Sequence, residues 1–274
     1  MAIQAPSLTH DGRAFFWRGG FETKDLPKQA GFRWDPARKC WWTPDTARAQ
    51  RLSAYADDDA QTAFRATQTR IAASRASTET TGNIPCPDGL AYIPYQCAGI
   101  AYALDRDTLI GDEMGLGKTI QALGIANVMD ATTILVVCPA SLRLNWHREA
   151  QKWLCRLHVF HIVEGGTDVP PQEATCIIVN YDVLSKPALR ASLMTRQWAL
   201  LIVDEAHYCK AGAKAQRAVA VLGKEARGQL SEEGLIHRAA RRVFLTGTPL
   251  MNRPIELWPL AHALDPKTFT NFFA

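Results

Sequence analysis

A short glycine-rich run, GDEMGLGKT at positions 111–119, carries the residue types that bind phosphate. Gly115 and Gly117 lack the Cβ atoms that would hold an anion away from backbone N–H groups. Lys118 has the length and charge to reach β- and γ-phosphates, and the Thr119 hydroxyl suits Mg²⁺. An apolar run precedes the glycines and a helical pattern begins at Lys118, which is the context that a phosphate-binding loop requires. The sequence therefore predicts a site for ATP and Mg²⁺.

One position departs from the strict loop pattern. GxxxxGK[ST] places glycine at position 112, where this chain has Asp112. The string GKT alone is short enough to recur by chance, so a glycine-rich structural turn is the alternative. The strand expected before the loop and the helix expected after it favour phosphate binding.

A pair of carboxylates forms the second candidate site. Asp204 and Glu205 directly follow the apolar run WALLIV at 198–203. Ligands of parallel sheets gather at the carboxyl ends of strands, where these side chains emerge. Asp204 is placed to hold Mg²⁺, directly or through water, and Glu205 to polarise an attacking water. A solvated acidic turn is the alternative, but two half-sites in the correct chain order favour a single site made of both.

The elements that must position these half-sites alternate along the chain from residue 84 onward. Apolar β-rich runs, separated by segments of helical period, lie at 108–111, 133–138, 176–180, 200–203 and 243–246. Strands that are apolar on both faces and alternate with helices indicate a mainly parallel sheet covered on both sides. We predict an α/β domain over 84–274, with Trp146 and Trp153 in its core because they share one helix face.

A smaller unit is expected before this domain. Residues 13–51 are rich in tryptophan and in basic residues, and turn signals separate short aromatic runs. We predict a basic α+β module over 1–55. Residues 56–83 begin with a helical pattern and end in a polar Ser/Thr-rich stretch, which predicts a helix and a linker.

The aromatic and basic residues of this module predict both a core and a binding surface. A module this small has little other bulk, so Trp34 and one of Trp41 and Trp42 are expected to be buried. Basic side chains interleaved with aromatic ones suit a surface that follows phosphates and stacks on bases. The exposed candidates for DNA binding are Arg33, Arg38 and Lys39.

Composition excludes several classes of protein. The 274 residues are 47% apolar and 21% charged with a net charge of +4, which indicates a folded globular chain. No apolar run approaches the roughly 20 residues that span a bilayer, and MAIQAPSLTH has no signal-peptide pattern. The seven cysteines show no CxxC spacing, so we expect free thiols in a reducing compartment. We predict a non-secreted protein without membrane contact, cytoplasmic or in the nucleoid in a prokaryote or phage and nuclear in a eukaryote.

Six segments, in order, resemble the motifs of the first motor lobe of Snf2-family DNA-dependent ATPases, within helicase superfamily 2. They are IPYQCAGI, GDEMGLGKTIQA, VVCPASLRLNW, IIVNYDVL, DEAH and FLTGTPLMNRPIELW. The family itself carries Asp where the strict loop pattern has Gly, so the resemblance weakens the objection at Asp112. It implies a RecA-like P-loop lobe with a parallel central sheet flanked by helices.

The resemblance also implies roles for residues at matching positions. Gln96 would read the adenine, and the residues around the nucleotide would include Leu116 and Ile120. The segments that follow the expected strands at 133–138 and 176–180 would contact the DNA backbone. These DNA-contact residues are Ser141, which we expect to cap the following helix, Asn145 and Tyr181. Coupling between ATP and DNA would involve His207, Thr246, Gly247 and Thr248.

The tail LTGTPLMNRPIEL, together with the tryptophan-rich module, is similar to the HepA-related, HARP-domain branch of annealing helicases. That branch implies an ATP-dependent translocase that remodels double-stranded or branched DNA. A second RecA-like lobe of the family supplies arginines that complete the ATP site, and no such lobe is recognised in this chain. We therefore expect a monomeric chain that binds nucleotide but hydrolyses it poorly by itself.

Two alternatives stay open. The chain could be a non-catalytic nucleic-acid-binding protein with a vestigial nucleotide fold, although its intact Lys118 and Asp204 argue against decay. The DEAH string also allows a superfamily 2 RNA helicase, but PASLRLNW and LTGTPLMN resemble Snf2 motors. Two departures from the family are Ala211, where many relatives have Asn, and the long stretch 223–242, which we expect to form an inserted surface helix.

Overall fold

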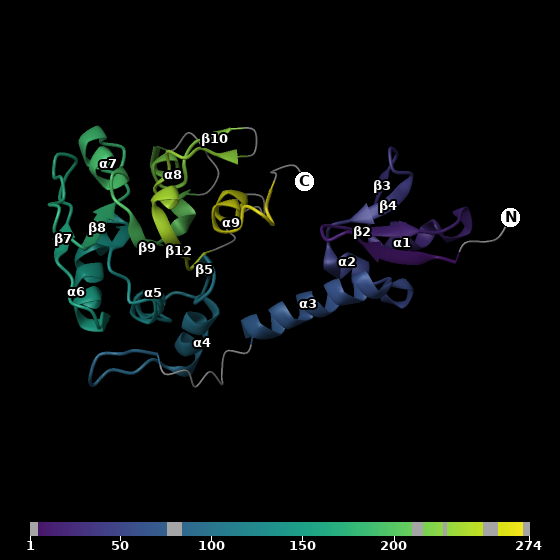
Figure 1. The fold of residues 1–274 in the computed structure, drawn as a ribbon, viewed down its shortest axis with the longest axis horizontal. Helices are drawn as coiled ribbons and strands as arrows, with labels where there is room; N and C mark the ends of the chain where they lie inside the picture. Colours follow the sequence, from purple (N-terminus) through teal and green to yellow (C-terminus); the bar gives the residue numbers. More distant parts are fainter. Residues whose placement is uncertain (1–4, 76–83, 210–215, 227–228, 249–256, 271–274) are drawn as a thin grey trace. The chain divides into compact units, whose positions relative to one another are not determined.

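A computed structural model describes residues 5–75, 84–209, 216–226, 229–248 and 257–270 of the chain. The chain divides into two compact units, residues 1–76 and 77–274, and each contains its own apolar core (Figure 1). Lys210, Ala211 and the tail at 249–256 lie outside the described residues. Within the described part, no helix is both long and apolar enough to cross a membrane.

The larger unit is built on a parallel six-stranded sheet, as the sequence predicted. In spatial order its strands are β5 (Thr108–Ile110), β12 (Ala239–Leu245), β9 (Trp198–Val203), β6 (Ile134–Cys138), β8 (Cys176–Asn180) and β7 (Phe160–Ile162). β6 and β8 are buried at every position, which explains why their runs are apolar without alternation. Only β7 was not predicted, because its three half-buried residues at the sheet edge form no apolar run.

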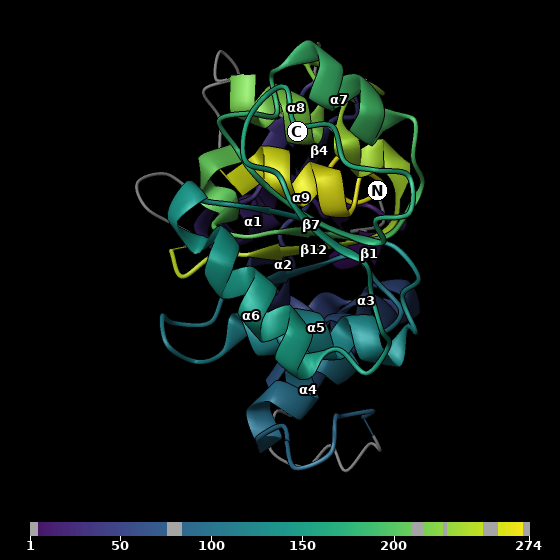
Figure 2. The same cartoon turned by 90° about the vertical axis from the view of Figure 1, so that its left-hand side faces the viewer.

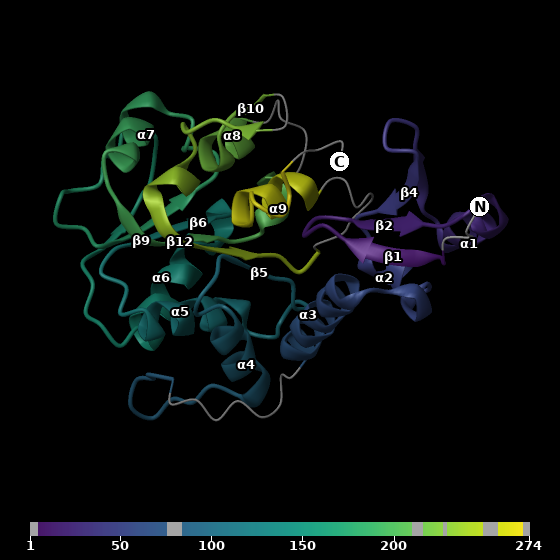
Figure 3. The same ribbon diagram turned by 45° about the vertical axis from the view of Figure 1, so that its right-hand side comes forward.

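Helices cover both faces of this sheet (Figures 2 and 3). One layer consists of α4 (Pro94–Tyr102), α5 (Lys118–Val128) and α6 (Arg143–Trp153). The other consists of α7 (Pro187–Met194), α8 (Gln216–Leu222) and α9 (Trp258–Leu264). Trp146 and Trp153 lie buried in the first layer, so their prediction as core residues is confirmed.

The stretch 223–242 does not form the surface helix that the sequence suggested. Its described residues include the antiparallel pair β10 (Glu225–Ala226) and β11 (Gln229–Leu230), then the 3₁₀ turn η5 (Leu235–Arg238). Gly223 has a φ of +92°, and a Cβ there would lie 2.2 Å from the carbonyl oxygen of Ser231. This close turn, followed by the buried Leu235 and Ile236, returns the chain to the sheet and prevents a continuous helix.

The smaller unit is an antiparallel four-stranded sheet packed on helices. Its strands, in spatial order, are β1 (Ser7–His10), β2 (Phe15–Arg18), β4 (Cys40–Thr43) and β3 (Arg33–Asp35). Its helices are α1 (Asp25–Ala30), α2 (Thr46–Gln50) and α3 (Asp58–Arg75), with 3₁₀ turns η1 (Phe21–Thr23) and η2 (Ser53–Tyr55). The N-cap Asp45 accepts hydrogen bonds from the backbone N–H groups of Ala47 and Arg48, which starts α2.

The helix α3 belongs to this unit and not to a linker. Ala60 and Phe64 are buried in the core of the small unit, and the Phe64 ring stacks on Phe15 with centroids 5.1 Å apart. The unit therefore extends past residue 55, where the sequence placed its end. The Ala/Thr-rich helix pattern hid this packing, because the described side chains that reach the core are mainly small alanines, Ala60 and Ala63, beside the single large Phe64.

Trp34 is not a core residue, so that expectation is wrong. Its side chain is 50% exposed, whereas Trp17 is only 2% exposed. Trp41 is half-buried at the margin of the core. Phe15, Phe32 and Phe64 supply the bulk that the sequence argument assigned to Trp34.

Candidate functional site

In the loop between β5 and α5, the side chain of Lys118 folds back onto the loop's own backbone carbonyls. Gly115 and Gly117 have left-handed φ angles of +86° and +74°, a conformation that glycine adopts without strain. The Nζ atom of Lys118 donates to the carbonyl oxygens of Asp112 at 2.8 Å and Glu113 at 2.9 Å. The loop thus curls around the ammonium group at the start of α5, where helix N–H groups favour an anion.

Asp112 explains why the strict glycine pattern is dispensable here. Among described residues other than glycine, left-handed φ angles occur at Lys39, Asp130 and Glu205, so the backbone at Asp112 does not need a glycine. The Oδ2 atom of Asp112 instead accepts a hydrogen bond of 2.7 Å from Nε2 of the buried Gln121. This bond ties the loop to α5, and the only sequence signal for Gln121 was a polar residue inside an apolar helix pattern.

Two residues of α4 hold the far end of the loop. Gln96 is buried, its Oε1 accepts from the backbone N–H of Ile93 at 3.2 Å, and its Nε2 donates to the Leu116 carbonyl at 3.5 Å. The Tyr95 hydroxyl donates to the same carbonyl at 2.9 Å. Gln96 therefore lies against the start of α5, its role at the adenine stays a prediction, and Tyr95 was not predicted.

We expect Gly117→Ala to destabilise the larger unit by about 1–2 kcal/mol, because a Cβ disfavours left-handed φ. That Cβ would also lie 2.4 Å from Nε2 of Gln96, so the glutamine would have to move. Urea unfolding measures the change. Gly165→Ala is the matched control, because a Cβ at Gly165 meets nothing within 4 Å. Equal stability of Gly117→Ala and wild type would contradict this account.

The two carboxylates lie at the end of β9 in different environments. Asp204 is 8% exposed, and burial is the main cause that raises its pKa, assisted by the Glu205 charge. Its Oδ2 accepts from Trp146 Nε1 at 2.8 Å and its Oδ1 from the Glu205 N–H at 2.9 Å. The Trp146 bond and the Lys118 charge favour the ionised form. Trp146 was predicted only as a core residue, and nothing in the sequence distinguishes the two roles.

We expect Trp146→Phe to lower the free energy of unfolding by about 2 kcal/mol at neutral pH, because a buried carboxylate loses a donor. Because burial raises the pKa of Asp204 in the folded state, its ionisation lowers stability as pH rises from the ordinary value of 3.8 to the raised value, and the cost is constant above it. The loss should therefore shrink at acidic pH, where Asp204 is protonated. Circular dichroism during urea unfolding at several pH values measures this.

Trp153→Phe is the control for this pH dependence. Trp153 is buried on the same helix, but its Nε1 has no hydrogen-bond partner among the described residues. Its replacement should cost packing energy equally at each pH. Identical pH profiles for the two variants would contradict the role of Trp146 at Asp204.

Glu205 is linked to β12 through a histidine. The Nδ1 atom of His207, in the 3₁₀ turn η4 (Ala206–Cys209), lies 3.0 Å from Glu205 Oε2 and 3.3 Å from Thr246 Oγ1. Thr246 is fully buried, and its Oγ1 also accepts from the Thr248 N–H at 3.2 Å. Glu205 itself has a φ of +49°, an unusual conformation for a non-glycine residue that is frequent at functional sites.

The ends of β5, β9 and β12 meet at this edge of the sheet. The Thr246 N–H donates to the Ile110 carbonyl at 3.1 Å. A Cβ on Gly247 would lie 3.6 Å from Lys118 Nζ, so the loop after β12 passes directly beside the phosphate-loop lysine. The structure thus brings together the residues that the sequence assigned to two half-sites and to coupling.

The chemistry of this edge fits a nucleoside triphosphate with Mg²⁺. A Cβ at Gly115 would meet nothing within 4 Å, so the loop has open space on that side. The half-buried Thr119 and the buried Asp204 offer the hydroxyl and carboxylate oxygens that Mg²⁺ prefers. Leu116 is exposed and Ile120 packs against the core, so their contribution would be backbone N–H groups near the helix start.

Two of the expected DNA contacts need correction. Ser141 lies in the 3₁₀ turn η3 (Ala140–Leu142) and does not cap α6, whose N-cap is Leu142, because that extra turn separates it from the helix. Tyr181 is 3% exposed and its hydroxyl donates to the Asp204 carbonyl. Burial raises its pKa well above 10, and it supports the carboxylate loop instead of facing solvent.

The other expected DNA contacts lie on the surface. Ser141 and Asn145 are both exposed beyond the carboxyl end of β6. In the smaller unit, Arg33 extends from β3, and Arg38 and Lys39 lie in the turn between β3 and β4. All three of these basic residues are exposed, as the sequence required for a binding surface.

Comparisons with known proteins identify the family of the chain. Residues 95–273 match the SNF2-related domain. The mouse (Mus musculus) DNA annealing helicase and endonuclease ZRANB3 is 35% identical over 187 residues, which cover 65% of this chain and 16% of that protein. The Caenorhabditis elegans homolog of SWI/SNF-related matrix-associated actin-dependent regulator of chromatin subfamily A-like protein 1 is 34% identical over 183 residues, 65% of this chain and 25% of that protein. The chain thus spans a quarter or less of these relatives.

Solved structures show the same fold. The Sulfolobus solfataricus SWI2/SNF2 ATPase core in complex with dsDNA superposes with a TM-score of 0.53 at 24% identity, over 72% of this chain and 39% of that one. The ATPase core domain from the same organism gives a TM-score of 0.50 at 22% identity, over 70% and 40% of the two chains. The larger unit therefore has the RecA-like fold of these cores.

Proposed function

The chain belongs to the SNF2-related family, and on that premise we propose that it is the nucleotide-binding lobe of an ATP-dependent translocase acting on double-stranded or branched DNA. The observation that carries the proposal is the junction at the carboxyl edge of the sheet. There Gly247, in the loop after β12, passes beside the Lys118 ammonium group, and His207 lies between Glu205 and Thr246 at 3.0 and 3.3 Å.

Each residue of this junction has a distinct task in the proposal. Lys118 turns from its two loop carbonyls toward the phosphates, and Gln96 recognises the adenine beside the loop. Thr119 and Asp204 hold Mg²⁺, which when bound neutralises charge on the phosphates. Glu205 orients and polarises the attacking water, and His207 holds its carboxylate in place.

The remaining charge stabilisation comes from outside this chain. In related P-loop enzymes an arginine is worth on the order of 10³–10⁵ in rate. We propose that a second RecA-like lobe supplies this arginine, so that this chain alone binds nucleotide and hydrolyses it poorly. His207, Thr246, Gly247 and Thr248 would relay the state of the nucleotide to DNA.

DNA would contact both units. On the larger unit, Ser141 and Asn145 offer exposed polar groups near the start of α6 for phosphates. On the smaller unit, the candidates are Arg33, Arg38 and Lys39. The name of the mouse relative, a DNA annealing helicase and endonuclease, supports DNA as the substrate class.

ATP hydrolysis by a form of the protein with both RecA-like lobes tests this function. We expect duplex or branched DNA to stimulate hydrolysis more than single strands or RNA of equal length. Stimulation by RNA alone would indicate an RNA helicase. Salt-dependent DNA binding by a chain that binds no ATP would indicate a nucleic-acid-binding protein with a vestigial nucleotide fold.

A further inference from the structure

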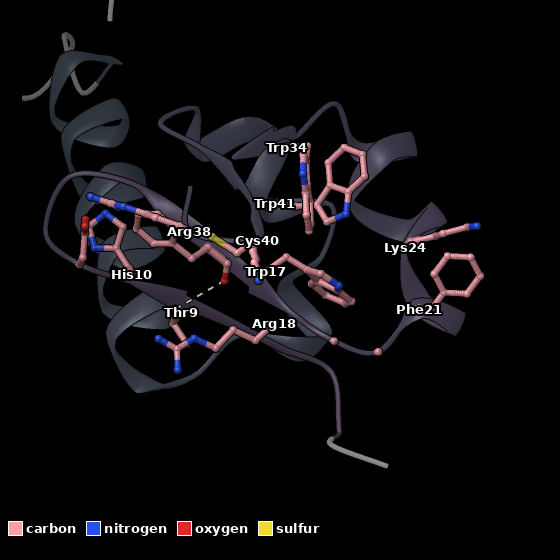
Figure 4. A pocket seen from close by; sticks show the side chains of 15 residues that line it. Thr9, His10, Trp17, Arg18, Phe21, Lys24, Trp34, Arg38, Cys40 and Trp41 are labelled. Carbon is pink, nitrogen blue, oxygen red and sulfur yellow. Dashed lines mark hydrogen bonds between the residues drawn. The ribbon is translucent and has the colours of Figure 1, made fainter. Parts of the chain in front are cut away.

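The smaller unit contains a wide hollow beside its sheet, lined by residues of β1, β2 and β4 and of the turns that adjoin them (Figure 4). Pairing between β2 and β4 ends where Trp17 lies opposite Trp41, and β2 then runs into Gly19 and Gly20. A hollow of about 1060 Å³ extends from the Gly-Gly turn along β1 and β2, and its lining includes Thr9 and Phe16. Pockets that hold one small molecule occupy roughly 300–1,000 Å³, so there is room here for more than one nucleotide.

Aromatic rings line this hollow without being needed for the core. Trp34 is 50% exposed and meets Trp41 edge-on, with centroids 5.6 Å apart and planes at 65°. Phe21 is 81% exposed at another side of the hollow, and Figure 4 shows it apart from the two tryptophans. Because other residues fill the core of this unit, these outward rings present faces for a planar ligand.

The same hollow carries a surplus of positive charge. Its lining includes Arg18, Lys24, Arg38 and Lys39 but a single carboxylate, that of Asp11. Arg38 lies over the Phe16 ring at 5.2 Å, and Lys24 Nζ lies 3.6 Å from the centre of the Phe21 ring. Cations that flank exposed rings suit a ligand with alternating planar and anionic groups.

The backbone at Lys39 adds an independent observation. Its φ is +51°, a left-handed conformation that strains a residue with a Cβ and that glycine would adopt freely. A lysine at this turn therefore reduces stability while placing an ammonium group at the hollow. Such local strain is characteristic of sites with a binding function.

We propose that this hollow binds unpaired nucleotides of a single strand, with bases stacked on Trp34 and Phe21 and phosphates on Arg38 and Lys39. Duplex DNA offers phosphates and base edges but keeps its base faces stacked, so exposed rings select the unpaired form. The inference deepens the proposed function and rests on it in one respect. The strand would be the unpaired arm of the branched DNA on which the motor acts.

Binding of a fluorescein-labelled oligothymidylate to the full chain, measured by anisotropy without nucleotide, tests the hollow. We expect Trp34→Ala to weaken single-strand binding about 5- to 100-fold, the effect of one lost base stack. Trp34→Phe, which keeps a ring, should restore most of the affinity. Duplex of equal length should bind more weakly than the single strand to wild type and change little on substitution.

Charge variants separate binding from folding. Lys39→Gly removes the ammonium group and relieves the left-handed strain, so it should weaken single-strand binding without lowering the melting temperature. Arg38→Gln should weaken binding and reduce its salt dependence, whereas the same change at Arg51, exposed outside the hollow, should not. Unchanged single-strand affinity in Trp34→Ala and Arg38→Gln would overturn the proposal, as would equal losses for duplex and single strand.

ATP binding by the same samples keeps the two proposals distinguishable. Trp34→Ala should retain wild-type ATP affinity, because its ring belongs to the other unit. If the chain bound the single strand at the hollow but bound no ATP, the single-strand site would be supported and the proposed ATP-dependent translocase would be contradicted. If ATP bound normally and the variants of the hollow did not change single-strand affinity, only the proposed single-strand site would be contradicted.

Discussion

Lys118→Ala should weaken ATP binding to this chain by about 10- to 100-fold. Hydrogen bonds from a charged donor contribute roughly 1.5–3 kcal/mol each, and 1.4 kcal/mol corresponds to a factor of 10 in affinity. In the structure the ammonium group spans the loop through the carbonyls of Asp112 and Glu113, at the distance of ordinary hydrogen bonds. Exchanging these carbonyls for phosphate oxygens exchanges neutral acceptors for charged ones, which are stronger.

Titration of a fluorescent ATP analogue with Mg²⁺ measures this effect. Lys267→Ala, which removes an exposed lysine from the same unit, is the matched control and should bind as wild type. Lys118→Arg tests geometry, because it keeps the charge but not the compact ammonium group, and it should also bind weakly. If Lys118→Ala bound ATP as tightly as wild type, the assignment of this loop to ATP binding would be contradicted.

The fold of the larger unit was readable from the sequence because its strands are buried on both faces. β6 and β8 have no solvent face, so their runs are apolar throughout and hard to mistake. The smaller unit was harder, since the described residues that α3 packs against the core are Ala60, Ala63 and Phe64, of which only Phe64 is large. Two alanines and one phenylalanine among polar residues leave only a weak periodic signal.

The site was predictable where backbone geometry demands a residue type, and not where a side chain has several uses. Gly115 and Gly117 reveal the loop because left-handed φ favours glycine. A buried tryptophan and a tryptophan that donates to Asp204 look identical in a sequence, so Trp146 was recognised only as core. For Tyr181 the sequence predicted a DNA contact where the structure shows a structural role. Its hydroxyl donates to the Asp204 carbonyl and is not available to DNA.

Glu205→Gln should separate binding from hydrolysis more sharply than any other change. A general base contributes typically 10²–10⁴-fold to rate, and glutamine retains the size of glutamate without its charge. The amide fits the same space beside His207, and the contact of His207 Nδ1 with Thr246 Oγ1 does not involve the carboxylate, so this contact should survive. We expect ATP affinity near that of wild type and DNA-stimulated hydrolysis lower by about 10²–10⁴-fold in the two-lobe form.

Glu113→Gln provides the control for this experiment, because it removes an exposed carboxylate from the phosphate loop itself. If lost negative charge near the phosphates were the cause, both variants would change alike, and ATP affinity would rise in each. If Glu205 acts on water, only its variant loses hydrolysis while its affinity stays. A third result, loss of both binding and hydrolysis in Glu205→Gln, would mean that the left-handed backbone at Glu205, with its φ of +49°, depends on the carboxylate for its shape. Nucleotide titration and hydrolysis measured on the same samples distinguish these three mechanisms.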